Sequence, residues 1–461
     1  MEMNEAEVST NLKKGKLTIG VIGVGRIGLP TAAVFADAGA KVIGADSNKD
    51  VVEAINHGET PIDEPGLKEL VEQVVRVGKL KATTNVVATA KISDALIVCV
   101  PTPVDESKTP DYSSLESACQ AISGGLRKGS LIIIESTVSP NTVESRVIPI
   151  LEDNTRMQAG RDFGVASCPE RADPGNILVH LKTTPRIVGG INAKSTEIAA
   201  ALYKAALGVQ VVKLANPKTA NAVKLTENIF RDVNIALMNE LAILYEKLGI
   251  DIIEVINAAA TKWNFVPHYP GVGVGGPCLP ANPYYLIQEG QKVGYIPHIV
   301  RMAREVNDRM PEHVVGLVLE ALNSIGKTAK NSKVAILGVT YKPGVRDIQN
   351  TPVEPVIMGL RKLGANVACY DPFFKNQELF KVKLAGTLAD AVKVADCIVL
   401  CTAHSEFQVL NFNELAKLAH KPAAFIDARG VVDPVKVLEA GLIFRGVGRA
   451  AVYKTKFVEG K

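Results

Sequence analysis

A cysteine follows a glycine-rich segment near the middle of the chain. The run Gly271-Val272-Gly273-Val274-Gly275-Gly276-Pro277-Cys278 has four glycines in six positions. Glycine lets a backbone pass close to a ligand and aim a neighbouring side chain at it. A thiolate here would be a nucleophile for covalent catalysis. The alternative is an inert cysteine in a tight turn, and the loop alone leaves both open.

Other polar side chains have spacings suited to catalysis. Lys224 and Asn228 are spaced i, i+4 and share a face of a predicted helix, with Arg231 beside them. Glu170 and Arg171 follow a predicted strand, where loops of parallel-sheet folds build ligand sites. Taken separately, the helical pair also suits a solvated surface, and a Glu-Arg pair suits a surface ion pair.

A dinucleotide fingerprint follows the first predicted strand. It reads Gly23-Val24-Gly25-Arg26-Ile27-Gly28 and opens a helical stretch. Its glycines permit a tight turn beside a pyrophosphate, which the helix N-terminus favours. Asp46, at the end of the next strand, can accept hydrogen bonds from a ribose diol and would repel a 2′-phosphate. These residues predict NAD rather than NADP; the alternative is a turn with coincidental glycines.

A second strand, predicted over Val334–Gly338, is followed by Val339-Thr340-Tyr341-Lys342-Pro343. This turn lacks the second and third fingerprint glycines. We expect this turn to bind a mononucleotide, partly through Lys342, rather than a dinucleotide.

Alternating strands and helices must position these groups. Continuous apolar runs of this kind are typical of buried parallel strands. The predicted strands are Leu17–Ile22, Lys41–Ala45, Ala95–Val100, Leu131–Glu135 and Gly164–Ser167, and then Val334–Gly338, Asn366–Tyr370, Cys397–Thr402 and Ala424–Asp427. Long helices are predicted over Lys218–Leu248 and, interrupted only by Pro311, over Pro297–Leu322.

The fold class is therefore α/β, with two Rossmann-like doubly wound parallel-sheet domains joined by a long-helix central region. We place the first domain at 1–205, the central region at 206–315 and the second sheet domain at 316–461.

Composition sets limits on partners and location. The 461 residues are 47% hydrophobic and 22% charged, with a formal net charge of +4, which gives no electrostatic footprint for nucleic acid. The seven cysteines include no CxxC pair, so neither disulfides nor a metal site is expected, and a reducing cytoplasm is the natural compartment. No signal peptide or membrane span is expected.

Taken together, these segments resemble the UDP-glucose/GDP-mannose dehydrogenase family over nearly the whole chain after Lys16. The match runs in order through Gly23–Gly28, Pro101-Thr102-Pro103, Glu135-Ser136-Thr137-Val138, Pro169-Glu170-Arg171, Lys224 to Asn234, the Cys278 loop, Tyr341-Lys342 and Asp427-Ala428-Arg429.

The resemblance implies two successive NAD-dependent oxidations of a sugar C6 alcohol to the acid, through a thioester on Cys278. It implies that Lys224 and Asn228 stabilise an oxyanion, and that Glu170 activates the hydrolytic water with Thr137 positioning it. The implied cofactor contacts are Gly23, Gly25, Arg26, Ile27, Gly28, Asp46, Thr102, Thr137 and Arg346. The implied substrate contacts are Glu170, Arg171, Lys224, Asn228, Arg231, Gly275, Lys342 and Arg429.

Three positions depart from the family pattern. Asn282 stands where an Asp follows the cysteine, and Gln349 stands where an Arg is usual, with Arg346 as a substitute. Pro277 replaces the usual His. Asn282 cannot act as a base, although it can still form hydrogen bonds.

The segments Thr261–Phe265, His268–Gly271 and Ala303–Asp308 resemble the N-acetylhexosamine branch most. We expect UDP-ManNAc or UDP-GlcNAc as substrate, with UDP-glucose as the alternative, and a homodimer or larger homo-oligomer. A non-catalytic nucleotide-sugar binder and a single-step hydroxy-acid dehydrogenase are the rival hypotheses. The remaining histidines, including His404 and His57, are expected at the surface or in packing.

Overall fold

The computed structural model describes residues 4–449. The chain forms two compact units, one of Met1–Glu227 with Tyr284–Ile296 and one of Asn228–Pro283 with Pro297–Lys461.

The first unit is built on an eight-stranded sheet of order β3-β2-β1-β4-β5-β6-β7-β8. The strands are β1 (Thr18–Ile22), β2 (Lys41–Ala45), β3 (Leu80–Thr83), β4 (Ala95–Val98), β5 (Leu131–Ile134), β6 (Gly164–Ser167), β7 (Arg186–Gly190) and β8 (Val211–Leu214). Neighbours are parallel except for the antiparallel β6–β7 pair. The sequence does not predict β3, β7 or β8, because β3 and β8 are short edge strands with few buried side chains and β7 ends in two glycines.

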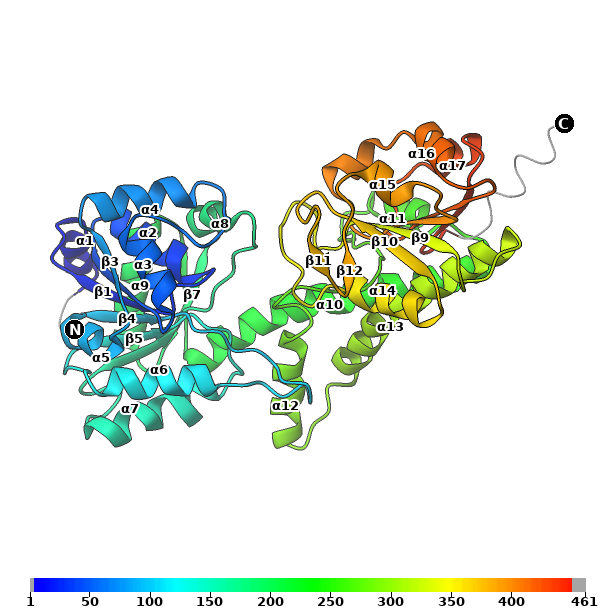
Figure 1. Cartoon of the computed structure of the whole chain (residues 1–461). Helices are drawn as coiled ribbons and strands as arrows, with labels where there is room; N and C mark the ends of the chain where they lie inside the picture. Colours follow the sequence, from blue (N-terminus) through cyan, green and yellow to red (C-terminus); the bar gives the residue numbers. More distant parts are fainter. Residues whose placement is uncertain (1–3, 450–461) are drawn as a thin grey trace. The chain divides into compact units, whose positions relative to one another are not determined.

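Helices cover both faces of this sheet (Figure 1). On one side α2 (Gly28–Asp37) contacts α4 (Leu67–Arg76), α8 (Ile177–Thr183) and α9 (Ala193–Leu207), which also packs on α1 (Glu5–Lys13). On the other side α6 (Ser113–Ser123) contacts α5 (Val86–Ile92) and α7 (Ile148–Thr155). The unit also contains α3 (Lys49–Asn56), a π-helix (Val143–Val147) and most of α12 (Asn282–Lys292).

Two long helices belong to the middle of the chain. Helix α10 (Pro217–Leu248) has 32 residues and is about 48 Å long. Helix α13 (His298–Ser324) runs through Pro311 without a break, so the predicted interruption is wrong. Pro311 has no N–H for the carbonyl of Asn307, and that carbonyl lies against Gly273, where an added Cβ would come within 2.9 Å of the oxygen.

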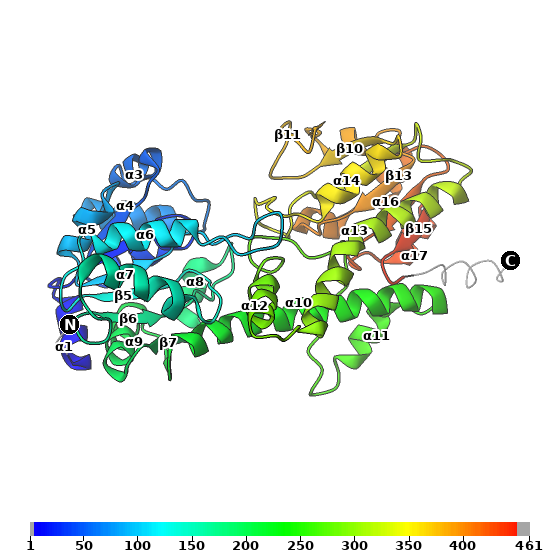
Figure 2. The same cartoon turned by 90° about the horizontal axis from the view of Figure 1, so that it is seen from below.

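The second unit has a parallel five-stranded sheet of order β10-β9-β13-β14-β15. Its strands are β9 (Lys333–Leu337), β10 (Asn366–Tyr370), β13 (Cys397–Leu400), β14 (Ala424–Asp427) and β15 (Ile443–Gly446). Helix α13 packs on β13, β14 and β15 and contacts α14 (Val353–Lys362), whereas α15 (Leu388–Val392) packs on β9 and β10 and contacts α16 (Phe412–Leu418). The unit also contains α11 (Ile252–Ala259), α17 (Pro434–Glu439), a 3₁₀ turn (Ser405–Val409) and a small hairpin of β11 (Glu378–Leu379) and β12 (Val382–Lys383). Figure 2 shows the same elements from below.

The two sheets repeat one arrangement. The orders β2-β1-β4-β5 and β10-β9-β13-β14 are equivalent, and both sheets begin with a glycine turn. The amide of Gly23 donates to Ala45 O, and that of Gly338 donates to Tyr370 O, each at 2.8 Å. The predicted α/β fold class is confirmed. No helix within residues 4–449 combines the length and hydropathy needed to cross a bilayer.

Candidate functional site

The turn after β1 has the geometry of a dinucleotide site. Gly23 has φ +83°, which only glycine adopts readily, and an added Cβ at Gly25 would meet open space. Helix α2 begins without a side-chain cap, and the Leu29 amide donates to Gly25 O at 3.0 Å. A helix N-terminus without a side-chain cap favours an anion. Asp46 Oδ2 accepts the Val24 amide at 3.0 Å and Oδ1 accepts the Asn48 amide at 3.0 Å. These residues fit NAD.

Thr102 and Thr137 are joined beyond the carboxyl ends of β4 and β5. The Thr102 hydroxyl donates to Thr137 O at 2.7 Å. Ser136 Oγ donates to Val100 O at 2.7 Å and so ties the same two loops together. Both predicted threonines therefore lie on one edge of the first sheet.

Glu170 and Lys224 face each other in the first unit. The Lys224 ammonium lies 3.8 Å from Glu170 Oε2, and both side chains are buried. Burial raises the pKa of Glu170, and the nearby Lys224 charge opposes that rise. Glu170 Oε1 is buried and has no hydrogen-bond partner within residues 4–449. The arrangement presents a carboxylate oxygen to a water or a substrate group.

A buried ion pair supports the loops around Glu170. Arg186 donates to Glu135 Oε1 at 2.5 Å and to Cys168 O at 3.1 Å. Its guanidinium also lies 5.2 Å from the Tyr203 ring centroid. Both charged side chains are almost wholly inaccessible to solvent. The pair fixes the residues that immediately precede Ser136 and Pro169.

Arg171 and Arg231 are placed differently from each other. Arg171 Nε donates to Glu227 Oε2 at 3.1 Å, so its guanidinium is bound to α10. Arg231 is exposed and donates to Asn228 Oδ1 at 3.4 Å.

Asn228 also bonds directly to the residue where the family pattern has an aspartate. Its Nδ2 donates to Asn282 Oδ1 at 2.5 Å, and both amides are buried. The Asn282 amide in turn donates to Cys278 O at 2.9 Å, where α12 begins. The half-buried Cys278 therefore lies just before a helix N-terminus, which favours negative charge.

The glycines before Cys278 make room for protein groups. An added Cβ at Gly271 would collide with the Arg429 guanidinium. An added Cβ at Gly275 or Gly276 would come within 2.7 Å of the Tyr341 side chain. The loop is thus pressed against segments from the carboxyl edge of the second sheet.

The cysteines differ sharply in environment. Burial raises the pKa of Cys119 to about 12, of Cys168 to about 11 and of Cys369 to about 12. Burial also raises the pKa values of Cys397 and Cys401. The pKa of Cys99 is raised by burial and by Glu135, to which its thiol donates at 3.1 Å. Cys278 is half-buried on the glycine-rich loop.

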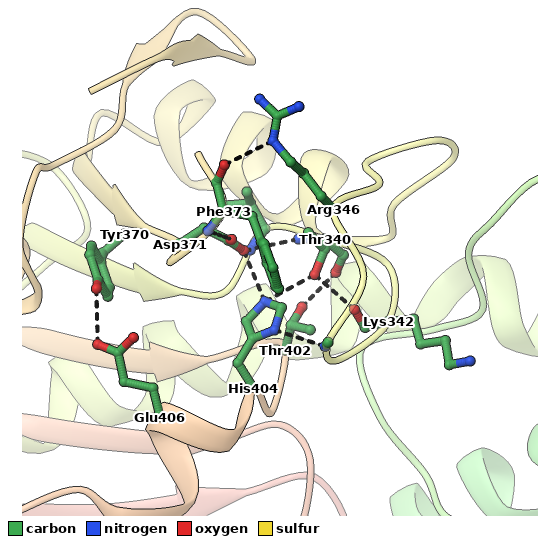
Figure 3. A network of polar contacts seen from close by, with 11 residues as sticks. Thr340, Lys342, Arg346, Tyr370, Asp371, Phe373, Thr402, His404 and Glu406 are labelled. Carbon is green, nitrogen blue, oxygen red and sulfur yellow. Dashed lines mark hydrogen bonds and ion pairs between the residues drawn. The ribbon is translucent and has the colours of Figure 1, made fainter. Parts of the chain in front are cut away.

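Three more predicted residues lie at the carboxyl edge of the second sheet. Lys342 is half-buried on the loop after β9 (Figure 3). Arg346 Nε donates to Phe373 O at 3.1 Å, and its guanidinium lies 4.9 Å from the Phe374 ring centroid. Asp427 Oδ1 accepts the Arg429 amide at 2.9 Å and holds the turn that carries this arginine.

Sequence reasoning missed the centre of this edge, which is His404. The side chain is 2% exposed, and Nε2 lies 3.1 Å from Asp371 Oδ2. Asp371 follows β10 as Asp46 follows β2, and that equivalence in the sequence was the available signal.

Comparisons with known proteins extend over these segments. Residues 17–207 match the NAD binding domain of the UDP-glucose/GDP-mannose dehydrogenase family. Residues 218–309 match its central domain, and residues 335–434 match its UDP binding domain.

Individual relatives are similar over most of their length. A UDP-N-acetyl-D-mannosamine dehydrogenase of Pyrococcus horikoshii is 38% identical over 95% of this chain and 100% of its own. A solved UDP-D-ManNAc dehydrogenase structure from that organism has a TM-score of 0.88, with 38% identity over 94% of this chain and 99% of the other. A UDP-N-acetyl-D-glucosamine 6-dehydrogenase of Pseudomonas aeruginosa is 33% identical over 91% of this chain and 98% of its own.

Proposed function

Because the chain belongs to the UDP-glucose/GDP-mannose dehydrogenase family, we propose that it oxidises the C6 alcohol of a UDP-N-acetylhexosamine to the carboxylate. The relatives named above act on N-acetylmannosamine or N-acetylglucosamine nucleotides, which supports this substrate class over UDP-glucose. UDP-N-acetylmannosamine is the first choice, because the relative of highest identity named here carries that name.

Residues up to Asn228 are assigned proton transfer and cofactor binding. Bound NAD supplies the electron acceptor and takes up two electrons in each of the two oxidations. Gly23, Gly25, Arg26, Ile27, Gly28, Asp46 and Thr102 would hold it. Lys224, with Asn228 one turn further along α10, would stabilise the negative charge that develops on the C6 oxygen.

Cys278 carries the second half of the reaction. Its thiolate sulfur forms a bond to the aldehyde carbon left by the first oxidation, and the resulting thiohemiacetal carbon is oxidised to a thioester. Glu170, with Thr137 as positioning residue, takes a proton from water, whose oxygen attacks the thioester carbon. The carbon–sulfur bond then breaks, and the sulfur leaves as a thiolate. The observation that carries this proposal is the buried Glu170–Lys224 pair, in which Glu170 Oε1 has no hydrogen-bond partner within residues 4–449 and can accept from the hydrolytic water.

The test offers UDP-ManNAc, UDP-GlcNAc and UDP-glucose to the enzyme while NADH and acid are measured. We expect two NADH per acid and the highest kcat/KM with an N-acetylated sugar. Cys278→Ser should form no acid, whereas the matched variant Cys99→Ser should turn over like the wild type. Full acid formation by Cys278→Ser would refute the thioester, and absence of NADH with every sugar would refute the activity.

We also propose that the chain divides functionally at about residues 205 and 315, into NAD-binding, central and UDP-sugar-binding parts. Arg171, Arg231, Gly275, Lys342 and Arg429 are the proposed substrate contacts besides the catalytic residues, and Arg346 is a proposed cofactor contact. Free thiols at all seven cysteines support a cytoplasmic location.

The proposed homodimer is supported by α10. Phe230, Leu237 and Leu244 are spaced seven residues apart on this helix and are 54%, 47% and 47% exposed. A spacing of seven residues keeps side chains on one helical stripe. Leu237→Asp should lower the mass measured by light scattering to that of one chain.

A further inference from the structure

We propose that His404 is a positioning residue for nucleotide binding, because its neutral imidazole holds the loop Thr340–Gly344 that presents Lys342. The inference rests on the UDP-sugar function proposed above, and it assigns a role to a side chain outside the predicted site.

The hydrogen bonds of His404 define its protonation. The Gly344 amide donates to Nδ1 at 3.1 Å, so Nδ1 carries no proton. Nε2 lies 3.1 Å from Asp371 Oδ2 and 3.0 Å from Thr340 Oγ1, both of which can accept its proton. The imidazole is therefore the neutral Nε2–H tautomer, assigned from its partners.

These bonds reach both sides of Lys342. The Thr340 hydroxyl donates to Lys342 O at 3.0 Å, and Gly344, two residues after Lys342, donates to the imidazole. The Thr340 carbonyl accepts the Thr402 hydroxyl at 2.6 Å. Figure 3 shows Thr340 and Thr402 next to His404, with the Lys342 side chain directed away from it. His404, Thr340 and Thr402 therefore hold the loop backbone, while the Lys342 side chain extends away from His404.

Asp371 anchors the imidazole from the other side. This carboxylate is fully buried and accepts the Val339 amide at 2.8 Å and the Phe373 amide at 2.9 Å. Burial opposes its ionisation, but the hydrogen bonds from His404 and these amides outweigh burial and lower the pKa of Asp371. His404 also packs against the rings of Phe373 and Phe407.

The comparison between the two sheets explains why a histidine is needed here. His404 lies four residues after Leu400, and Thr102 lies four residues after Val98, which is the equivalent strand end. Asp46 is half-buried, whereas Asp371 is fully buried and satisfied by the protein. Asp371 is therefore engaged by protein groups, and the imidazole it anchors contacts the loop after β9.

The loop Thr340–Gly344 also carries Tyr341, whose ring packs against the glycine-rich loop before Cys278. Tyr341 packs over Gly275 and Gly276, three and two positions before Cys278. A loop displaced at Thr340 or Gly344 would therefore disturb both Lys342 and this packing. Nucleotide affinity reports a displaced loop more directly than catalysis does, because Lys342 is itself the proposed nucleotide contact.

Two amide variants separate the two sides of the imidazole. His404→Asn places Oδ1 where Nδ1 accepts from Gly344, and His404→Gln places its amide nitrogen toward Asp371 without that acceptor. UDP itself is the probe, with Kd measured by calorimetry, alongside KM for the UDP-sugar and for NAD. We expect His404→Gln to weaken UDP binding and raise the UDP-sugar KM by about tenfold, with the NAD KM unchanged and kcat within about twofold. His404→Asn should stay within about threefold of wild type in UDP affinity.

His420→Asn is the matched control. His420 Nδ1 lies 2.6 Å from Asp396 Oδ1, and Asp396 immediately precedes β13, at the other end of the strands. This variant should alter the unfolding temperature but not the UDP affinity.

A second pair tests the same contacts with the imidazole intact. Thr340→Val removes the hydroxyl between Nε2 and Lys342 O, and Thr340→Ser keeps it. We expect weaker UDP binding with valine and nearly normal binding with serine, whether or not His404→Gln folds. Unchanged UDP affinity in Thr340→Val, or equal losses in His404→Asn and His404→Gln, would overturn the positioning role. Because wild-type UDP binding is measured without sugar oxidation, failure of the proposed activity would be seen separately.

Discussion

The side-chain amide of Asn228 donates to Asn282 Oδ1 at 2.5 Å, so two neutral residues form a buried bond next to the cysteine loop. The family pattern places an aspartate at the second position. In this chain that position can accept a hydrogen bond but can neither hold a charge nor take a proton at neutral pH. In the proposed mechanism, proton transfer is therefore assigned to the Glu170–Lys224 pair.

Asn282→Asp should make the Cys278 thiol harder to ionise. The new carboxylate keeps the bond from Asn228 and adds a negative charge near the sulfur, which disfavours a thiolate. We expect the pH midpoint of Cys278 alkylation by iodoacetamide to rise by about one unit. Cys278→Ala supplies the background from other cysteines, and Asn264→Asp, at an exposed position, should leave the midpoint in place. A midpoint that stays fixed in Asn282→Asp would contradict this placement.

Glu170→Gln should trap the enzyme before hydrolysis. Glutamine cannot take a proton from water, so the thioester should accumulate and acid formation should fall by about 10²–10⁴-fold. The measurement is the intact protein mass after mixing with UDP-sugar and NAD. Glu144→Gln is the control, because burial raises the pKa of Glu144 too, but the residue lies outside the proposed site. Normal turnover without an adduct would show that another group activates the water.

The pH profile should carry the signature of Glu170. In the proposed mechanism the ionised carboxylate is the active base. Burial raises the pKa of Glu170, and the Lys224 charge opposes that rise. Acid formation should therefore fall, as pH is lowered, at a higher pH than an ordinary glutamate would give. Lys224→Met removes the opposing charge and should move this acid limb to still higher pH, in addition to lowering kcat. An acid limb that does not move would argue against the pairing at 3.8 Å.

Features set by a short stretch of chain could be predicted. The fingerprint Gly23–Gly28, strand β2 and Asp46 form one continuous segment, and helix α10 begins within one residue of its predicted start. Apolar periodicity and turn glycines are local signals of this kind.

Features set by distant partners could not be predicted. Asp371 and His404 are 33 residues apart, and Glu135 and Arg186 are 51 apart. Nothing in the residues around His404 shows that its imidazole meets a buried carboxylate. The glycines before Cys278 illustrate the same limit, because the side chain that occupies their space, Tyr341, comes from another part of the chain.

Cofactor choice should depend on Asp46. Asp46→Ser removes the carboxylate that would bind the ribose diol and repel a 2′-phosphate. We expect the KM for NAD to rise about tenfold and that for NADP to fall, which initial rates with each cofactor measure. Asp46→Asn is the matched variant, since it loses the charge but keeps an acceptor for the Val24 amide, and it should lie between serine and wild type. An unchanged ratio in Asp46→Ser would place the ribose elsewhere.

The buried Arg186–Glu135 pair should dominate the stability of the first unit. Arg186→Met removes the bond to Glu135 Oε1 and leaves a carboxylate buried without its counter-charge. Such a loss costs about 3–5 kcal/mol in the free energy of unfolding, which urea titration followed by circular dichroism measures. Arg301→Met, which breaks the exposed pair with Glu305, should cost at most about 0.5 kcal/mol. The double variant Arg186→Met/Glu135→Gln should recover part of the lost stability, because no buried charge then remains unpaired. A double variant less stable than Arg186→Met would mean that the pair contributes mainly through packing against Tyr203 and not through charge.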